Sequence, residues 1–310
     1  MEIGSSDAQS LTCECPLCGT SNAGVKSWMG STVYSNRRFD YLECCECRSL
    51  YIYPMPDEEY LSNLYDSSYG AIHSRSEDDQ RRDLSFVLNI LSARRPGFFV
   101  DYGCNDGSLA LAIREAGWSV GGVELNAEVA EVVSRRTGIS VLTPDQALKE
   151  WDGAIDILHL GDVIEHLRDP VKTLRSLESM LNPNGLIIAQ GPLEANKCIF
   201  TLALKYSRIA KGNRDSAMPP YHLILATARG QQEFFRRLGL NNLDFTISEA
   251  NWPAPAKFPW PLAGNFRGAG MYALRKISQL TSSNLRNWGN RYSYFGSVSS
   301  RIDDRISHEE

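Results

Sequence analysis

The sequence lacks any long hydrophobic run, and no stretch approaches the ~20 apolar residues of a membrane-spanning helix. Its first ten residues lack the basic start and apolar core of a secretory signal peptide. Positive charge is in deficit, since 32 Lys and Arg face 37 Asp and Glu and leave a net charge of -5. Binding to nucleic-acid backbones without sequence specificity requires clustered positive charge. The sequence therefore predicts a cytoplasmic protein with no membrane span and no nucleic-acid partner.

Cysteine is plentiful by contrast, with eight residues, six of which fall between Cys13 and Cys47. A reducing cytosol favours metal ligation over disulfides for such a cluster. Two C-x-x-C pairs, with 25 residues between them, can direct four thiolates at one ion and complete the tetrahedral sulfur shell that zinc prefers. The predicted ligands of this structural Zn²⁺ are Cys15, Cys18, Cys44 and Cys47.

Some details of this zinc ribbon stay open. Cys13 and Cys45 are spare, so either could replace a neighbour as a ligand. Arg48 stands where ribbons of this kind usually carry a small residue, and it could distort the second knuckle. The alternative is a pair of reduced hairpins without metal.

The stretch from Phe98 to Glu124 predicts a strand, a glycine turn, a helix and a second strand. An apolar run at 98–100 precedes the turn at 101–107, and apolar residues then recur at helical spacing over 108–116. Glycines let a backbone approach a ligand closely, and free N–H groups at the start of the helix face it. A carboxylate at the end of the second strand can accept both hydroxyls of a ribose. The unit therefore predicts a nucleoside-bearing ligand.

The dinucleotide fingerprint is missing from this turn. G-x-G-x-x-G would need glycines where the chain has Asn105 and Ser108, so a nicotinamide-dependent dehydrogenase is disfavoured. The pattern Asp-x-Gly-x-x-x-Gly, followed by an acid that ends the next strand, instead resembles motif I of class I S-adenosylmethionine-dependent methyltransferases. Its Cys-Asn-Asp-Gly centre is similar to the variant found in sugar methyltransferases. A tight turn that binds nothing is the alternative.

This resemblance implies a set of cofactor-binding positions. In the family, the acid and the glycines of the turn surround the methionine part of S-adenosylmethionine, and the acid that ends the second strand holds the ribose. An acid past the next strand often lies near the adenine amino group; Asp145 matches it, although it is equally suited to capping the following helix. The implied residues are Asp101, Gly103, Cys104, Asn105, Gly107, Glu124, Leu125, Asp145 and Asp162.

Two further motifs place reactive side chains near the same edge. The segment 161–167 follows a predicted strand, where open α/β sheets bind ligands, and it closely resembles the Glu-Val-Ile-Glu-His form of ubiquinone-pathway O-methyltransferases. Its Asp162, Glu165 and His166 could hold a divalent cation such as Mg²⁺, orient a substrate or take a proton, or they could merely stabilise the loop. The segment 219–223 resembles a Pro-x-His-Leu motif whose histidine faces the substrate. His222 is therefore the preferred general base, with a buried structural histidine as the alternative.

Alternating helices and strands continue to the C-terminus. Predicted helices span 57–65, 79–94, 127–136, 198–208, 227–238 and 270–280, another opens at Asp169-Pro170, and the final strand, 291–298, is antiparallel. The segment 252–267, rich in proline and aromatic residues, is suited to covering an apolar or sugar-like substrate. The predicted organisation is a mobile tail (1–12), the zinc ribbon (13–56), covering helices (57–96), a methyltransferase domain (97–300) with substrate-cap insertions at about 193–222 and 250–285, and a polar tail (301–310).

The sequence thus predicts an α/β protein with a Rossmann-like, seven-stranded methyltransferase sheet and an N-terminal zinc ribbon. The predicted reaction is S-adenosylmethionine-dependent O-methylation of a sugar or secondary-metabolite hydroxyl. A lipid-linked intermediate is a further candidate acceptor, and helix 270–280 could form a homodimer contact. An RNA-modifying methyltransferase and a catalytically inactive binding protein remain alternatives. A basic face would favour the RNA enzyme, but the lysines and arginines are scattered.

Overall fold

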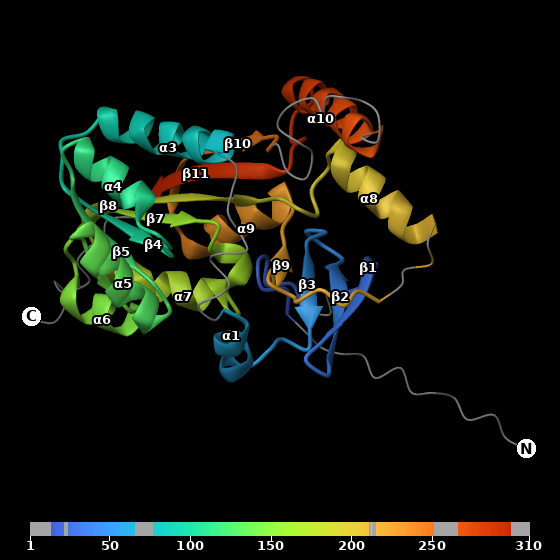
Figure 1. The fold of residues 1–310 in the computed structure, drawn as a ribbon, viewed down its shortest axis with the longest axis horizontal. Coiled ribbons are helices and arrows are strands. Elements are labelled where there is room, and N and C mark those ends of the chain that lie inside the picture. The colour runs from blue at the N-terminus through green and yellow to red at the C-terminus, as the bar shows by residue number, and fades with distance from the viewer. Residues whose placement is uncertain are drawn as a thin grey trace, which may run out of the picture.

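The computed structural model describes residues 14–21, 24–65, 77–210, 212, 215–250 and 266–298. The predicted tails, Cys13 and most of the aromatic and proline-rich segment lie outside these residues. Two sheets form the framework (Figure 1). In the described part of the chain, no helix is long and apolar enough to cross a membrane.

The larger sheet has seven strands in the order β10-β11-β8-β7-β4-β5-β6. Its strands are β4 (Phe98–Tyr102), β5 (Ser119–Val123), β6 (Ser140–Leu142), β7 (Ile155–Gly161), β8 (Leu181–Pro192), β10 (Asn241–Ser248) and β11 (Arg291–Ser297). Strands β6, β5, β4, β7 and β8 pair in parallel, whereas β11 runs antiparallel to both β8 and β10. The predicted fold class, including the antiparallel last strand, is confirmed.

Helices cover both faces of this sheet because its strands carry apolar side chains on both sides. Phe99 and Ile157 face one layer and pack against α3 (Glu77–Ser92) and α4 (Ser108–Glu115). Their neighbours Val100 and Leu158 belong to the other layer. This alternation is the two-residue period of a strand. The second layer contains α6 (Pro144–Glu150), α7 (Pro170–Leu177) and α9 (Ala228–Leu238), while α5 (Ala127–Thr137) packs beside α4.

Helix caps fall mostly where the sequence predicts them. Asp169 caps α7 by accepting the Lys172 N–H, and Gly239 ends α9 in the left-handed region. The capping alternative for Asp145 is wrong, because Thr143 is the N-cap of α6 and Asp145 lies in its first turn. A capping box between Thr143 and Gln146 satisfies this helix end, which leaves Asp145 exposed.

The smaller sheet joins the N-terminal region to a distant part of the chain. Strands β1 (Gly24–Tyr34), β2 (Arg37–Cys44) and β3 (Leu50–Tyr53) form an antiparallel meander. Strand β3 then pairs with β9 (Ile224–Leu225), which begins two residues after His222. The cysteine-rich region is therefore built into the molecule through backbone hydrogen bonds.

Three further helices lie outside the two layers. Helix α1 (Glu58–Leu64) follows β3, and Asp57 caps it by accepting the Tyr60 N–H. Helices α8 (Ile199–Ala210) and α10 (Phe266–Asn284) pack on each other around Phe200 and Met271 (Figure 1). Helix α10 is longer at both ends than its predicted span of 270–280.

Gly230 on α9 tests how tightly the cysteine-rich region docks. A methyl group there would overlap the Ser49 hydroxyl and lie 3.3 Å from the Cys47 sulfur. Gly230→Ala is therefore expected to destabilise the protein by about 1–3 kcal/mol despite alanine's better helix propensity. Gly270→Ala on α10 is the matched control, because nothing lies within 4 Å and the change should stabilise by about 0.5–1 kcal/mol. Denaturant unfolding measures the free energy of unfolding of both variants. Equal stabilisation by the two substitutions would contradict the tight contact between α9 and the cysteine-rich region.

Candidate active site and metal centre

The glycine turn after β4 is built from left-handed residues. Gly103 has φ +78°, Asn105 +47° and Gly107 +74°. A side chain at Gly103 would come within 2.8 Å of the Val163 side chain, so the glycine also permits a close approach of the loop after β7. Asparagine tolerates the left-handed region better than most residues, which explains how the turn forms without a glycine at 105.

Glu124 lies across from this turn at the end of β5. Its carboxylate accepts the backbone N–H of Asn105 at 3.3 Å and that of Asn126 at 3.4 Å. Burial raises the pKa of Glu124, and these backbone donors offset part of the rise. The predicted ribose acid and the predicted turn are therefore adjacent, with both carboxylate oxygens oriented by backbone donors.

The other predicted cofactor residues differ in how they face this turn. Leu125 is 63% exposed beside Glu124. The Cys104 sulfur packs inward, since a methyl at Gly122 would meet it at 2.7 Å, so Cys104 offers only its backbone. Tyr102 was missed by the sequence reasoning; burial, with Asp145 and Glu124 nearby, raises its pKa to about 12.

Asp101 is buried behind the turn. Its carboxylate accepts a hydrogen bond from His159 Nδ1 at 2.7 Å, and His159 Nε2 lies 3.3 Å from the Gln190 amide oxygen. Neither partner was predicted, because both come from the neighbouring strands β7 and β8. Asp101 thus supports the turn through the sheet.

Asp162 is also held by partners that no motif contains. It has φ +55° at the end of β7, and its carboxylate lies 2.6 Å from Arg291 Nη1. Arg291 Nη2 lies 2.6 Å from Asp83 on α3. These three charges form a chain from α3 through β11 to the predicted cofactor edge.

A cluster of Glu165, His166 and His222 assembles beside Asp162. One oxygen or nitrogen from each lies within 4.8 Å of the others. His166 donates from Nδ1 to the Tyr221 carbonyl at 2.8 Å, and the Tyr65 hydroxyl lies 3.0 Å from the same nitrogen. Both predicted histidines and the predicted glutamate therefore meet, although 56 residues separate the two imidazoles in the sequence.

Glu194 is a further member that the sequence reasoning missed. His222 Nδ1 donates to its carboxylate at 2.6 Å. Burial alone would lower the pKa of His222, but Glu194, with Glu165 and Asp162, outweighs burial and raises it to about 9. Only the position of Glu194, just past β8, could have suggested it.

Glu165 is almost fully buried, and one of its carboxylate oxygens has no hydrogen-bond partner among the described residues. Burial, followed by the Asp162 charge, raises its pKa to about 8. The cluster holds two imidazoles and excludes Asp162, unlike the predicted Mg²⁺ site. Magnesium prefers all-oxygen shells, so these donors do not fit it.

The four predicted zinc ligands come together at the other end of the small sheet. Cys15 and Cys47 sulfurs are 3.7 Å apart, and Cys18 and Cys44 sulfurs are 3.5 Å apart. A tetrahedral shell with ~2.3 Å Zn–S bonds requires separations of about 3.8 Å. The residues present therefore fit a tetrahedral metal ion.

The second knuckle is intact despite Arg48. Arg48 adopts φ +65°, as Gly19 does at +76° in the first knuckle, and each donates its N–H to the cysteine four residues earlier. The suspected distortion is therefore wrong: the Arg48 side chain extends into solvent toward Glu43. Cys45 is exposed, whereas Cys44 and Cys47 are buried and cluster with Cys15 and Cys18.

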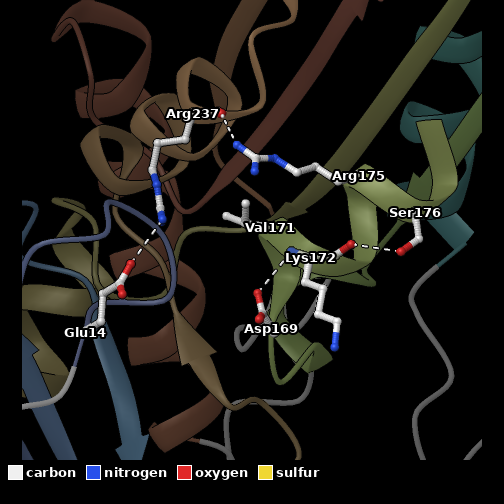
Figure 2. A pocket seen from close by; sticks show the side chains of 7 residues that line it. All are labelled: Glu14, Asp169, Val171, Lys172, Arg175, Ser176 and Arg237. Atoms are coloured by element: carbon white, nitrogen blue, oxygen red, sulfur yellow. Dashed lines mark hydrogen bonds and ion pairs between the residues drawn. The ribbon is translucent and has the colours of Figure 1, made fainter. Parts of the chain in front are cut away.

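A surface pocket of about 500 Å³ lies elsewhere, between α7, α9 and the first knuckle. Figure 2 shows Arg237 reaching from α9 to Glu14, at 3.1 Å, and it also donates to the Leu17 carbonyl. Arg175 on α7 donates to the backbone of Arg237. None of the predicted site residues lines this pocket, and Arg237 there ties the first knuckle to α9.

A sequence profile described as "Methyltransferase domain" matches residues 76–244, more than half of the chain. The chain belongs to the methyltransferase domain family. Its relatives include ubiquinone biosynthesis O-methyltransferases of Colwellia psychrerythraea, 27% identical over 28% of this chain and 39% of the relative, and of Proteus mirabilis, 27% identical over 42% and 59%. The ubiquinone biosynthesis O-methyltransferase of Caulobacter sp. is 30% identical over 34% of this chain and 43% of the relative. The chain thus spans less than two thirds of each of these relatives.

The chain is also similar to solved structures of low sequence identity. A SAM-dependent methyltransferase from Archaeoglobus fulgidus is 15% identical, with a TM-score of 0.45 over 72% of this chain and 95% of that one. The PH0226 protein from Pyrococcus horikoshii is 12% identical, with a TM-score of 0.47 over 78% and 99%.

Proposed function

We propose that this protein is an S-adenosylmethionine-dependent methyltransferase that acts on a hydroxyl group of a small molecule. The observation that carries the proposal is the placement of the Glu124 carboxylate against the left-handed turn at Gly103 and Asn105. A second carboxylate and two imidazoles lie at the same edge of the sheet, where such folds bind ligands. Membership of the methyltransferase family supports this reading.

The residues divide the site into a cofactor end and an acceptor end. Glu124 would hold the ribose hydroxyls, and the backbone of 103–107 would approach the amino-acid part closely. Asp145 would lie near the adenine amino group, and Tyr102, whose pKa Asp145 and Glu124 help to raise, would lie close by. When bound, S-adenosylmethionine supplies an electrophilic sulfonium methyl group, so the protein's tasks are to exclude water, align the acceptor and remove a proton.

His222 is the proposed general base. Its Nδ1–H is held by Glu194, so the other ring nitrogen of the neutral imidazole can take the acceptor's proton, and Glu194 stabilises the resulting imidazolium. His166 and Glu165 would orient the acceptor hydroxyl. The relatives' name, ubiquinone biosynthesis O-methyltransferase, supports oxygen as the acceptor atom. Within that class we propose a sugar or secondary-metabolite hydroxyl, as the sequence predicts.

We also propose that the four-cysteine site binds a structural zinc ion. Its sulfur separations fit a tetrahedral shell, and Cys47 donates its backbone N–H to the Cys44 sulfur at 3.5 Å. All four positions of the shell come from the protein, which leaves no position for a substrate.

Cofactor binding tests the proposal most directly. Glu124→Ala should weaken S-adenosylhomocysteine binding by about 10- to 100-fold, because two charge-assisted ribose hydrogen bonds are lost. Isothermal titration calorimetry measures the change, with exposed Glu131→Ala on α5 as the control. If the wild-type protein released no heat with this ligand, the proposed activity would be wrong.

The pH profile tests the base. Because His222 must be neutral to accept a proton, kcat/KM should rise with pH up to about 9. Glu194→Gln removes the charge that raises the pKa of His222, so the rise should move to lower pH while kcat falls about 10- to 100-fold. Glu165, with a pKa of about 8, could also shape the pH profile of the wild-type protein. The shift of the profile in Glu194→Gln is therefore the result that identifies His222. An unmoved profile would rule out His222 as the base.

Neighbouring cysteines test the metal site. Cys44→Ser should release the ion and lower the melting temperature, because the small region around it depends on the metal for its fold. Cys45→Ser, one residue on and exposed, should keep one zinc per chain. Elemental analysis measures the zinc content of both variants, and thermal unfolding measures their melting temperatures. Retention of zinc by Cys44→Ser would contradict the assignment of Cys44 as a ligand.

A further inference from the structure

Helix α8 carries apolar side chains on two sides. Phe200 is buried at the contact with α10. Leu202, Tyr206 and Ile209 are exposed, and their i, i+4, i+7 spacing places them together on another face of the helix. A helix at the surface of a globular protein normally presents polar residues to water. The exposed stripe of α8 therefore indicates contact with an apolar partner.

Helix α10 repeats this arrangement. Met271 and Leu274 pack against the buried end of α8, whereas Ile277 and Leu280 are 54% and 68% exposed. Figure 1 shows the two helices side by side, outside the layers that cover the large sheet. They carry half of the large apolar side chains that are exposed in the described part of the chain. Such a concentration marks a binding surface, unlike apolar residues that are exposed singly.

The charges on these helices have one sign. Neither α8 nor α10 contains an Asp or Glu, although acids outnumber bases in the chain as a whole. The sequence over 250–302 contains no acid and seven Lys and Arg residues. Glu249, the acid just before this stretch, accepts the hydroxyls of Ser278 and Ser282 at 2.6 and 2.7 Å. Because Ser278 is buried, the charge of Glu249 is held on the inner side of α10.

The cations of these helices are available to a partner. Within the described residues, four of them on or beside α8 and α10 have no carboxylate partner: Lys197, Lys205, Lys276 and Arg286. Lys276 lies over the Tyr272 ring, with 5.5 Å from its Nζ to the ring centroid, which leaves its charge uncompensated. A partner that fits this surface must therefore be apolar and negatively charged at once.

We propose that the outer face of α8 and α10, formed by the exposed apolar stripes and the four cations beside them, binds the surface of a membrane that contains anionic lipids. Aliphatic and aromatic side chains can enter the boundary between headgroups and acyl chains. Lysine and arginine side chains beside them attract the anionic headgroups. The protein would lie on such a membrane through this face.

The proposed face adjoins the acceptor end of the site. Helix α8 begins five residues after Glu194, and the Thr201 hydroxyl donates to the Glu194 carbonyl at 3.4 Å. Membrane binding would therefore bring the acceptor end toward the lipid. The inference itself concerns a surface outside the site, so it does not depend on the proposed methyltransferase function.

A second copy of the chain fits this face less well than a lipid surface does. In a dimer with two-fold symmetry, the same patch of each subunit meets its counterpart. The cations of one copy would then approach those of the other, and no acid on either helix would compensate them. An anionic membrane supplies the missing negative charge. Charge complementarity therefore favours the lipid surface.

Vesicle co-sedimentation with the full-length protein tests the proposal. The protein should bind vesicles of equal parts phosphatidylcholine and phosphatidylglycerol at least about tenfold more tightly than vesicles of phosphatidylcholine alone, because the cations then meet anionic headgroups. Ile277→Ser should weaken binding to the anionic vesicles about 3- to 10-fold through lost apolar burial. Lys276→Glu should weaken it about 10- to 30-fold, because it reverses a charge at the lipid surface.

Two matched variants control for changes elsewhere on the surface. Val132→Ser replaces a β-branched residue of α5 that is 56% exposed, close to the value for Ile277. Lys149→Glu reverses the charge of an exposed lysine on α6. Each control should leave vesicle binding within about twofold of the wild-type value, because neither residue lies on the proposed face.

Each outcome decides the inference. Equal binding to both kinds of vesicle, binding to neither, or equal losses in test and control variants would overturn it. A dimer that Ile277→Ser dissociates in analytical ultracentrifugation, without vesicle binding, would overturn it in favour of a second copy. Should Ile277→Ser fail to fold in thermal unfolding, Leu280→Ser replaces a more exposed side chain, and it must also weaken vesicle binding. S-adenosylhomocysteine binding is measured separately, so a failure of vesicle binding leaves the methyltransferase function standing.

Discussion

The carbonyl of Val123 accepts two hydrogen bonds, and the rest of the site depends on them. The backbone N–H groups of Gly103 and Cys104 reach it at 2.8 and 3.0 Å, which ties the turn after β4 to the end of β5. Because Glu124 is the next residue, the same contact places its carboxylate beside Asn105. A residue with a side chain at 103 would both strain the left-handed backbone and push away the loop after β7. One backbone geometry therefore fixes the turn, Glu124 and the Asp162 loop together.

Carboxyl groups are concentrated along this edge at a cost to folding. Asp101, Asp162, Glu165 and Glu194 converge on it, against Arg291 and the histidines. The buried oxygen of Glu165 has no partner among the described residues, and such groups are expensive in a folded chain. Active sites commonly retain such strained electrostatics because a charged ligand or a transferred proton uses them.

The sequence predicted what lies within one strand or turn, and it missed what tertiary packing brings together. The turn at 103–107, the position of Glu124 beside it, the meeting of the two histidines and the four-cysteine cluster follow from local motifs whose spacing carries the signal. Glu194 contacts His222 across 28 residues, His159 contacts Asp101 across 58, and Arg291 contacts Asp83 across 208. No periodicity marks such partners. Asp162 illustrates the difference: its motif was recognised, but the arginine that binds it could not be.

The N-terminal region also contributes to the geometry of the acceptor end. Leu223, next to His222, donates its N–H to the Glu165 carbonyl at 2.8 Å, and its own carbonyl accepts the N–H of Ile52 on β3 at 3.0 Å. A single residue thus connects the small sheet to both the histidine and the glutamate of the cluster. Strand β2 ends at Cys44 and pairs with β3, and β3 pairs with β9, so backbone pairing connects the four-cysteine cluster with the segment that follows His222. The four-cysteine cluster therefore belongs to the same framework as the Glu165–His166–His222 cluster, although no cysteine lies within that cluster.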